Sequence, residues 1–462
     1  MPIININEKL LTCESGENLY KVLLQDGVAL NAPCGGAGTC GKCYVWIDGV
    51  GKVKACSYLV KQDCTVRLVM PRNEIATKGY LREKEADWKS PCFAVDIGTT
   101  TVVVYYMNNG QIVDIESEMN AQKSFGDDVV TRIKYTMEQE NGTEVLHTLI
   151  KNQIDEMVLT LSRRNHITSD RVVIVGNTTM LHLYAKISPA SIGVSPFKPV
   201  FTALMKIENT TLLPSISGYV GADTVAAILA SGMHLSNKKS LLIDIGTNGE
   251  IALGNCDGIV TCAAAAGPAF EGAQISCGVG GVAGAINSIS IGDSISYTTI
   301  DQMPPVGICG SAILDAVAQM IGAQLVDETG YFEEEELKIT EKIYINAKDI
   351  RQVQLAKAAI AAGINTLLRE SNIALSEIET CYLAGGFGSY LNKNSACGIG
   401  LLPNELLDKI KVIGNAAGMG AVLWQISDEC KKEVQSILEM TTYFELSGSK
   451  VFQEEFINCM LF

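Results

Sequence analysis

The sequence lacks the features that would tie the protein to a membrane or to nucleic acid. No apolar run approaches the ~20 residues that a helix needs to span a bilayer. Basic residues are scarce: 36 Lys and Arg face 51 Asp and Glu, and the formal charge of -15 argues against nucleic acid or an anionic membrane as a partner. The opening stretch MPIININEKLLTCESGENLY carries early acidic residues and no apolar core, unlike a secretory signal. We therefore expect a cytoplasmic protein.

Two common nucleotide-binding patterns are also missing. No segment matches the P-loop pattern G-x4-G-K-[ST], and no G-x-G-x-x-G follows an expected strand, which excludes the P-loop and Rossmann interpretations. Histidine is rare, and the 4 histidines show no pairing at metal-ligand spacing. His182, within TTMLHLY, is therefore expected to be a packed core residue.

Cysteine, by contrast, is plentiful and unevenly placed. The count of 15 is odd, and no secretory signal accompanies it, so a disulfide framework is not expected. Four thiols follow the spacing Cys34-x5-Cys40-x2-Cys43-x12-Cys56. A zinc ribbon needs two C-x2-C knuckles and this segment has one, whereas plant-type [2Fe–2S] clusters use C-x4-C-x2-C and a distant fourth cysteine. The spacing predicts a [2Fe–2S] cluster on these four cysteines; zinc or reduced structural thiols are the alternatives.

The flanking residues favour a small ferredoxin-like domain over residues 1–70. The stretches at 2–7, 10–15, 42–49 and 63–71 alternate as strands, and NLYKVLLQDG has helical spacing with a Gly stop. Glycines around the thiols would bring backbone N–H groups close to the cluster. Cys13 and Cys64 fall on strands and are expected in the core. Residues 71–90 cluster charge without periodicity and are interpreted as a linker.

Two hairpin turns with the same residue pattern then follow, each after an apolar strand. The first hairpin turn, in CFAVDIGTTTVVVYY, carries Asp96, Gly98, Thr99, Thr100 and Thr101. The second, in SLLIDIGTNGEIALG, carries Asp244, Gly246, Thr247, Asn248 and Gly249. Backbone amides and hydroxyls in such turns suit phosphate oxygens, and the carboxylate suits a hydrated metal ion. The repeat predicts a duplicated α/β domain that clamps one nucleotide from both sides.

Two further glycine motifs follow strands: CAAAAGPAFEG at 262–272 and CYLAGGFGSYL at 381–391. Gly-Gly after a strand lets a flat base or ribose lie against the backbone. The order D-x-G-T-T, D-I-G-T-N-G, A-G-P-A-F-E-G, A-G-G-F-G resembles the acetate and sugar kinase/Hsc70/actin superfamily. With a plant-type ferredoxin domain in front, the chain resembles the reductive activators of corrinoid proteins; VGNTTMLHL, GYVGADTVAAIL and QLAKAAIAAGI are also similar to that family.

The resemblance implies a ferredoxin-like β-grasp domain followed by a two-lobed, ribonuclease H-like ATPase domain over 91–462. It implies ATP-dependent reduction of an inactive Co(II) corrinoid protein to Co(I), with ATP and Mg²⁺ as further cofactors, an upstream electron donor and a homodimer. The two hairpin turns would hold the phosphates and Mg²⁺, Gly267 and Glu271 the ribose side, and Gly385, Gly386 and Phe387 the adenine. Asp223 would orient an attacking water; the alternative is that it only caps the TVAAILASG helix.

Two departures from the family pattern stand out. The described activators carry a middle domain, whereas only the short linker is expected here between cluster and ATPase. The stretch CGVGGVAGAI follows F-E-G where relatives commonly carry an Arg. Two other functions stay open: a small-molecule kinase with a fused regulatory cluster, and an actin-like module that uses nucleotide only as a conformational ligand.

Overall fold

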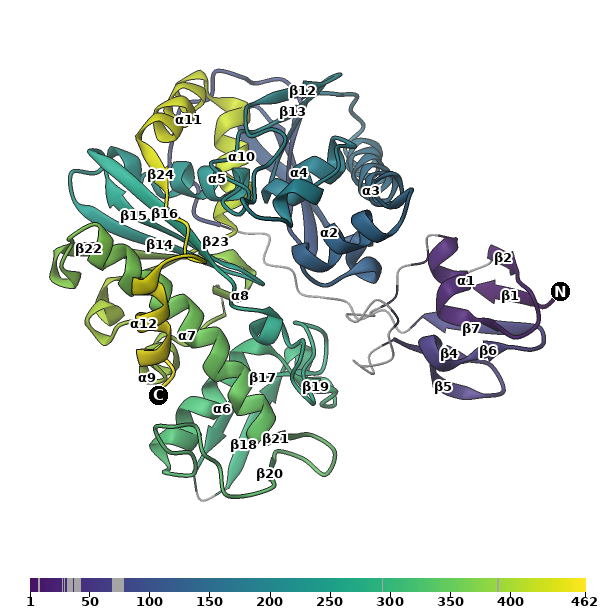
Figure 1. Cartoon of the computed structure of the whole chain (residues 1–462). Coiled ribbons are helices and arrows are strands. Elements are labelled where there is room, and N and C mark those ends of the chain that lie inside the picture. The colour runs from purple at the N-terminus through teal and green to yellow at the C-terminus, as the bar shows by residue number, and fades with distance from the viewer. Residues whose placement is uncertain are drawn as a thin grey trace.

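A computed structural model describes residues 1–6, 9–26, 28, 30, 36, 43–68, 79–292, 294–388 and 390–462, without the side chains of Lys52 and Leu68. Figure 1 shows a small N-terminal domain beside a larger body with two lobes. No described helix is long and apolar enough to cross a membrane.

The N-terminal domain is a mixed five-stranded sheet with one short helix against it. The strand order is β2 (Lys9–Thr12), β1 (Ile3–Ile6), β7 (Cys64–Leu68), β4 (Tyr44–Ile47), β5 (Gly51–Lys54), with β1 and β7 parallel. Alternate side chains such as Ile4 and Ile6 point into the core. The helix α1 (Leu19–Gln25) begins at Asn18, whose side chain accepts from the Lys21 amide. The predicted ferredoxin-like strands and helix are confirmed; β5 and the small pair β3 (Glu17–Asn18) and β6 (Leu59–Val60) were not predicted.

The predicted duplication is visible in the sheets of the two lobes. The first lobe has the order β10 (Gln111–Met119), β9 (Thr101–Asn108), β8 (Cys92–Ile97), β11 (Val172–Gly176), β13 (Thr210–Leu212), β12 (Met205–Ile207). The second has β24 (Thr441–Tyr443), β16 (Gly258–Ala264), β15 (Gly249–Asn255), β14 (Lys239–Ile245), β22 (Ile378–Ala384), β23 (Ile410–Gly414). In each lobe the strand that ends in the acidic turn pairs antiparallel with the next strand and parallel with a later one. The acidic turns therefore lie at equivalent edges of the two sheets.

Two helices lie between these sheets and join the lobes. They are α5 (Ala222–Ser231) and α10 (Ala416–Ile426) (Figure 1). Small residues allow the close approach: a Cβ on Gly420 would lie 2.0 Å from the Ala226 carbonyl oxygen. The same core includes Val95 of β8 and Leu242 of β14, so apolar burial holds both sheets against the helix pair.

The remaining helices and small sheets pack around the two large sheets. The first lobe carries α2 (Val129–Glu138), α3 (Gly142–Arg164) and α4 (Thr178–Tyr184). The second carries α6 (Gly310–Gly322), α7 (Ala347–Glu370), the short α8 (Gly385–Gly388) and α9 (Lys393–Gly398), the small sheet β18 (Ile295–Thr299), β17 (Ala285–Ile291), β19 (Gly307–Ile308), and the pair β20 (Glu336–Lys338) and β21 (Tyr344–Asn346). The chain closes with α11 (Asp428–Met440) and α12 (Lys450–Asn458).

The described part of the predicted linker, residues 79–90, is an anchored strap. The Tyr80 amide donates to the Ile413 carbonyl, and the Trp88 amide donates to the Ile426 carbonyl. Arg82 and Lys84 both pair with Glu433 of α11. Burial alone would raise the Glu433 pKa, but hydrogen bonds from His234, Arg82 and Lys84 lower it to about 2. The described strap has no helix or named strand of its own, and its contacts fix it to β23 of the second lobe and to the helices α10 and α11.

Candidate functional site

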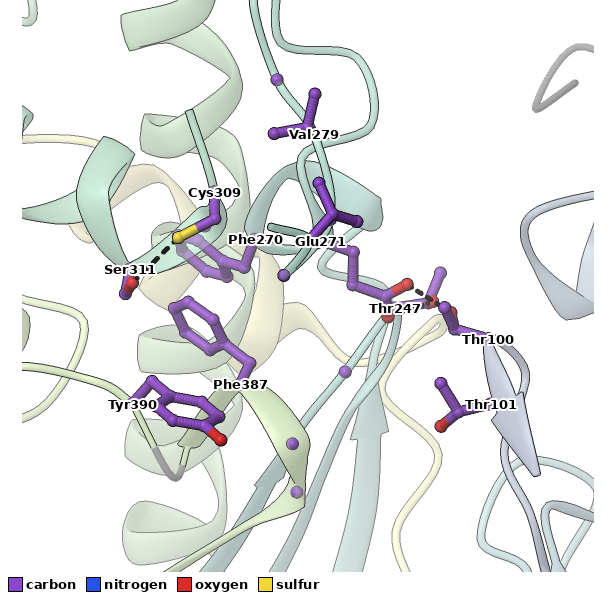
Figure 2. A pocket seen from close by; sticks show the side chains of 18 of the residues that line it. Thr100, Thr101, Thr247, Phe270, Glu271, Val279, Cys309, Ser311, Phe387 and Tyr390 are labelled. Atoms are coloured by element: carbon purple, nitrogen blue, oxygen red, sulfur yellow. Dashed lines mark hydrogen bonds between the residues drawn. The ribbon is translucent and has the colours of Figure 1, made fainter. Parts of the chain in front are cut away.

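The two hairpin turns face each other across a cavity of about 1010 Å³. Its lining includes the first hairpin turn from β8 to β9, the second from β14 to β15, and α8 after β22. Figure 2 shows the threonines of both turns on one side of this cavity and an aromatic group on the other. The space is large enough for a nucleotide-sized ligand.

Besides Glu271, four carboxylates line this cavity: Asp96, Asp223, Asp244 and Glu250. Among the described residues, none of the four belongs to an ion pair. Burial is the main reason why the pKa values of Asp96 and Asp244 rise to about 7 and that of Asp223 to about 6. Repulsion from Asp223 raises the pKa of both Asp96 and Asp244 further. Buried, mutually repelling carboxylates without basic partners favour a bound cation or a retained proton.

Glu250 was missed at the level of the sequence. It lies directly opposite Asp244 in the antiparallel pair of β14 and β15, so both side chains share one face of the sheet. Like charges at directly opposed positions destabilise a sheet. Burial first, and then Asp223 and Asp244, raise the Glu250 pKa well above its ordinary value. The sequence did hold a signal for Glu250, because it is an acidic residue two positions after Asn248 in the same β hairpin.

Gly385 lies against the Asp244 carboxylate. A Cβ at this position would lie 2.3 Å from Asp244 Oδ1, and the backbone has φ +86°. Both facts require glycine. Opposite it, Asn415 Nδ2 donates to Asp96 Oδ2 at 2.9 Å and fixes that carboxylate from the start of α10.

Glu271 joins the two hairpin turns. Its Oε2 accepts from Thr100 Oγ1 at 2.5 Å, and its Oε1 accepts from Thr247 Oγ1 at 2.7 Å (Figure 2). One carboxylate therefore bridges the two lobes at the place where phosphates were expected. The predicted contact of Glu271 with ribose stays a prediction.

The backbone of the first hairpin turn is held by residues that the sequence did not reveal. Arg132, fully buried, donates to the Thr99 carbonyl, and Asn177 Nδ2 donates to Thr99 Oγ1 at 3.1 Å. Burial lowers the Arg132 pKa to about 10, which still leaves it charged at neutral pH. These contacts tie the turn to α2, which carries Arg132, and to the start of α4, where Asn177 is the N-cap.

Asp223 lies in the first turn of α5, but it is not the cap of that helix. The N-cap is Gly221, which makes no side-chain capping bond. Asp223 Oδ1 accepts from the Thr224 amide at 2.7 Å, which fixes the carboxylate at the cavity. The interpretation of Asp223 as only a helix cap is therefore wrong; its catalytic role stays a prediction.

An aromatic wall faces the carboxylates. The Phe270 and Phe387 rings stack with centroids 5.0 Å apart and planes 10° apart, and Tyr390 lies beside them (Figure 2). Phe270 and Tyr390 were not singled out in the sequence, although both lie within the motifs that were. A stacked aromatic pair at the edge of a polar cleft suits a flat heterocycle.

Most predicted nucleotide-site residues line this cavity. They are Asp96, Gly98, Thr99, Thr100, Thr101, Asp223, Asp244, Gly246, Thr247, Asn248, Glu271, Gly385, Gly386 and Phe387. Gly249 and Gly267 do not line it. Gly249 begins β15 and packs on α7, where a Cβ would lie 2.9 Å from Ile360, and Gly267 sets the φ +74° turn before Pro268.

The predicted cluster ligands are only partly described. Cys34 and Cys40 lie outside the described residues. Cys43 is buried, and the Cys56 amide donates to Cys43 Sγ at 3.4 Å. Backbone N–H groups directed at sulfur are typical of cluster ligands. Within the described ranges, no three His, Cys, Asp or Glu side chains are grouped to hold a metal ion.

His182 is a core residue, as predicted. Its Nδ1 donates to the Thr178 carbonyl at 2.7 Å, its Nε2 accepts from the Val200 amide at 3.1 Å, and its ring stacks on Phe201. Cys13 is buried in the N-terminal core, as expected, whereas Cys64 on β7 is only partly buried and packs against that core.

Sheet duplication, an acidic cleft and a ferredoxin-like domain define the class: an iron–sulfur domain joined to an actin- and sugar-kinase-like body. Residues 3–70 match the family model of a 2Fe-2S iron-sulfur cluster binding domain. Residues 92–236 match that of the RACo middle region, and 238–462 that of the C-terminal domain of RACo, the ASKHA domain.

Two named relatives and one solved structure support the same family assignment. The chain is 34% identical over 415 residues to the corrinoid activation enzyme RamQ of Eubacterium limosum, covering 80% of this chain and 70% of that protein. It is 30% identical over 227 residues to the [Co(II) methylated amine-specific corrinoid protein] reductase of Methanosarcina barkeri, covering 44% of this chain and 42% of that one. A solved reductive activator for a corrinoid, iron–sulfur protein superposes with a TM-score of 0.72 at 28% identity, covering 100% of this chain and 98% of its own. The chain belongs to the RACo family of reductive activators of corrinoid proteins.

One expectation is corrected by these matches. The middle domain is not missing: the middle-region match covers the first lobe, which the sequence had assigned to the ATPase. The duplicated strand pattern explains the error, because the first lobe has the same strand order around its acidic turn as the second. The domain boundaries at 70 and 90 stay predictions.

Proposed function

We propose that this protein uses ATP hydrolysis to drive one electron from its cluster to an inactive Co(II) corrinoid protein, which becomes Co(I) and competent for methyl transfer. The observation that carries the proposal is the fusion itself. A one-electron carrier has no use in phosphorylating a metabolite, whereas a reductase requires one. Tyr44, the residue after the predicted ligand Cys43, also lines the cavity between the lobes, so the two functional parts adjoin.

The cavity supports Mg·ATP as the ligand. The phosphates would lie between the threonines of the two hairpin turns, in the place now bridged by Glu271. The carboxylates without basic partners fit a Mg²⁺ ion, which would supply charge neutralisation at the phosphates. Mg²⁺ usually retains several waters and takes only one or two protein carboxylates, and Asp96 and Asp244 of the two hairpin turns are the carboxylates proposed for it.

For the cluster we propose the [2Fe–2S] type, held by Cys34, Cys40, Cys43 and Cys56. The buried Cys43 sulfur with its amide donor supports a ligand role. The cluster would supply one-electron chemistry. Plant-type clusters lie near about -400 mV, and an uphill electron costs roughly 2.3 kcal/mol per 100 mV. If the Co(II) corrinoid has a lower reduction potential than the cluster, the electron must move uphill, and ATP hydrolysis supplies the free energy for that step.

Asp223 is the proposed water-orienting residue. At pH above its pKa of about 6 the carboxylate is charged and can accept a proton from water, while its Oδ1 stays bound to the Thr224 amide. Asn415 Nδ2 donates to Asp96 Oδ2, and a hydrogen bond from Asn248 partly offsets the rise in the Glu250 pKa.

The test is direct. Reduced protein, Mg·ATP and a Co(II) corrinoid protein of a methyltransferase system are mixed anaerobically, and Co(I) absorbance is followed. We expect Co(I) only with both ATP and a reduced cluster, and phosphate release that rises when the corrinoid protein is present. The Asp223→Asn variant should bind ATP and fail to form Co(I). Formation of a phosphorylated metabolite without Co(I) would instead establish the kinase.

Three further parts of the proposal concern the surroundings: a cytoplasmic location, an upstream electron donor that reduces the cluster, and a homodimer through the ATPase body. Sedimentation of the purified protein at micromolar concentration tests the dimer. Rereduction of the oxidised cluster by candidate ferredoxins tests the donor.

A further inference from the structure

The first hairpin turn is tied through its backbone to one short segment, the 3-10 helix η2 (Ala121–Phe125) and its N-cap Asn120. Asn120 Nδ2 donates to the Gly98 carbonyl at 2.8 Å, and the Asn120 amide donates to the Thr100 carbonyl at 2.9 Å. The Thr99 carbonyl between them accepts from Arg132. All three carbonyls of the turn are therefore held, two by Asn120 and one by Arg132.

Arg132 also reaches η2 directly. Its Nε donates to the Gly126 carbonyl at 2.9 Å, and its Nη1 donates to Gln122 Oε1 at 3.2 Å. Gln122, Ser124 and Arg132 are each at most 1% exposed. A fully buried guanidinium leaves little room for the turn to move alone, because a shift of the turn would break these charged hydrogen bonds.

The opposite side of η2 holds the N-terminal domain. The Leu30 amide donates to Ser124 Oγ at 2.8 Å, and Ser124 Oγ donates to the Leu30 carbonyl at 3.2 Å. The Tyr20 hydroxyl donates to the Ser124 carbonyl. Leu24 of α1 packs against the cores of both domains.

Tyr20 reaches the cysteine segment as well. Gly36, between the predicted ligands Cys34 and Cys40, lies so close that an added Cβ would be 2.3 Å from the Tyr20 ring. On the other side of η2, Lys123 lines the cavity between the lobes. Adjacent residues of one helical turn thus face the nucleotide cavity and the domain that carries the thiols.

We propose that η2 is the mechanical connection between the nucleotide site and the cluster domain, with Ser124 and Tyr20 as positioning residues for electron delivery. The inference rests on the proposed function. A phosphate at the first hairpin turn shifts the Gly98–Thr100 backbone, Asn120 and Arg132 transmit the shift to η2, and Ser124 moves the cluster domain at Leu30 and Tyr20. Coupling of this kind requires one structural element whose position depends on both sites. The segment η2 contacts both the first hairpin turn and the cluster domain.

The experiment uses the full-length protein with its cluster reconstituted. Amide hydrogen exchange is measured over Leu19–Gln25 and Ala121–Phe125, with and without Mg²⁺ and a non-hydrolysable ATP analogue. In the parent both segments should respond. In the double variant Tyr20→Phe/Ser124→Ala the response should persist over Ala121–Phe125 and fall at least threefold over Leu19–Gln25. More ATP should then be hydrolysed per Co(I) formed.

The control is Tyr58→Phe, because Tyr58 packs on the core of the N-terminal domain itself and should behave as the parent. If the double variant does not take up iron, Tyr20→Phe alone keeps the ring and removes one hydrogen bond. A response over Leu19–Gln25 that survives in the variants overturns the proposal. Analogue binding without any response in that segment of the parent overturns it too, while leaving the proposed function intact. Failure of the parent to bind the analogue refutes both.

Discussion

Replacing Asp244 by asparagine should stabilise the nucleotide-free protein while abolishing its ligand affinity. The Asp244 pKa rises from 3.8 to about 7, chiefly through burial and then through Asp223 and Asp96. Below about pH 4 Asp244 is protonated in both the folded and the unfolded chain, so it does not lower the free energy of unfolding. As the pH rises to 7 the unfolded chain ionises first, and the folded state loses stability progressively.

The magnitude follows from the size of the shift. A change of about three pKa units corresponds to roughly 4 kcal/mol at most, and we expect roughly 1–3 kcal/mol because neighbouring carboxylates share the penalty and relax when one is removed. The gain from Asp244→Asn should be near zero at pH 4 and complete above pH 7. For a protein of this size it amounts to a few degrees in the thermal midpoint.

The assay compares thermal unfolding of the nucleotide-free parent and variant at pH 5 and pH 8, with calorimetric titration of Mg·ADP at pH 8. The matched control is Asp408→Asn, because Asp408 is exposed and outside the cavity. A variant that is less stable than the parent at pH 8, or a gain independent of pH, would refute the electrostatic reasoning. Retained Mg·ADP affinity would refute the role of the carboxylate in ligand binding.

Three further outcomes are expected. Cys43→Ser should lose cluster iron and acid-labile sulfide, whereas Cys64→Ser should keep both, as measured by iron and sulfide analysis after anaerobic purification. Gly385→Ala should lower Mg·ADP affinity at least tenfold without loss of cluster iron, because its Cβ would collide with the carboxylate of the second hairpin turn; unchanged calorimetric affinity would contradict the close contact. Glu271→Gln weakens the bridge between the threonine turns, so limited proteolysis of the nucleotide-free protein should be faster than in the parent, and equal rates would show that the bridge does not hold the lobes.

Local patterns predicted the parts of the fold that repeat or alternate. The two D-x-G-T turns gave the duplicated sheet, because a strand, an acidic turn and a second strand are consecutive in the chain. The alternation in the first seventy residues gave the ferredoxin-like strands. The same reliance on repetition caused the error over the middle region, since the first lobe carries the turn of an ATPase half.

Contacts between distant segments could not be predicted. Glu250 became visible only through its register opposite Asp244. In the sequence, Arg132 is an ordinary arginine of an amphipathic helix, and only the fold places its guanidinium at the Thr99 carbonyl. Asn415 donates to Asp96 although the two residues are 319 positions apart in the sequence. The convergence of carboxylates is a property of the sheet edges meeting, which no single motif encodes.

The anchored strap sets how far the cluster domain can travel. The last described strand of that domain ends at Leu68, and the strap is fixed from Gly79 onward. Eleven peptide steps span at most ~40 Å when fully extended. Any movement of the cluster domain that leaves the strap in place therefore keeps Leu68 within that distance of Gly79. A corrinoid centre that accepts the electron must accordingly come to the cluster domain near the lobes, and not the reverse.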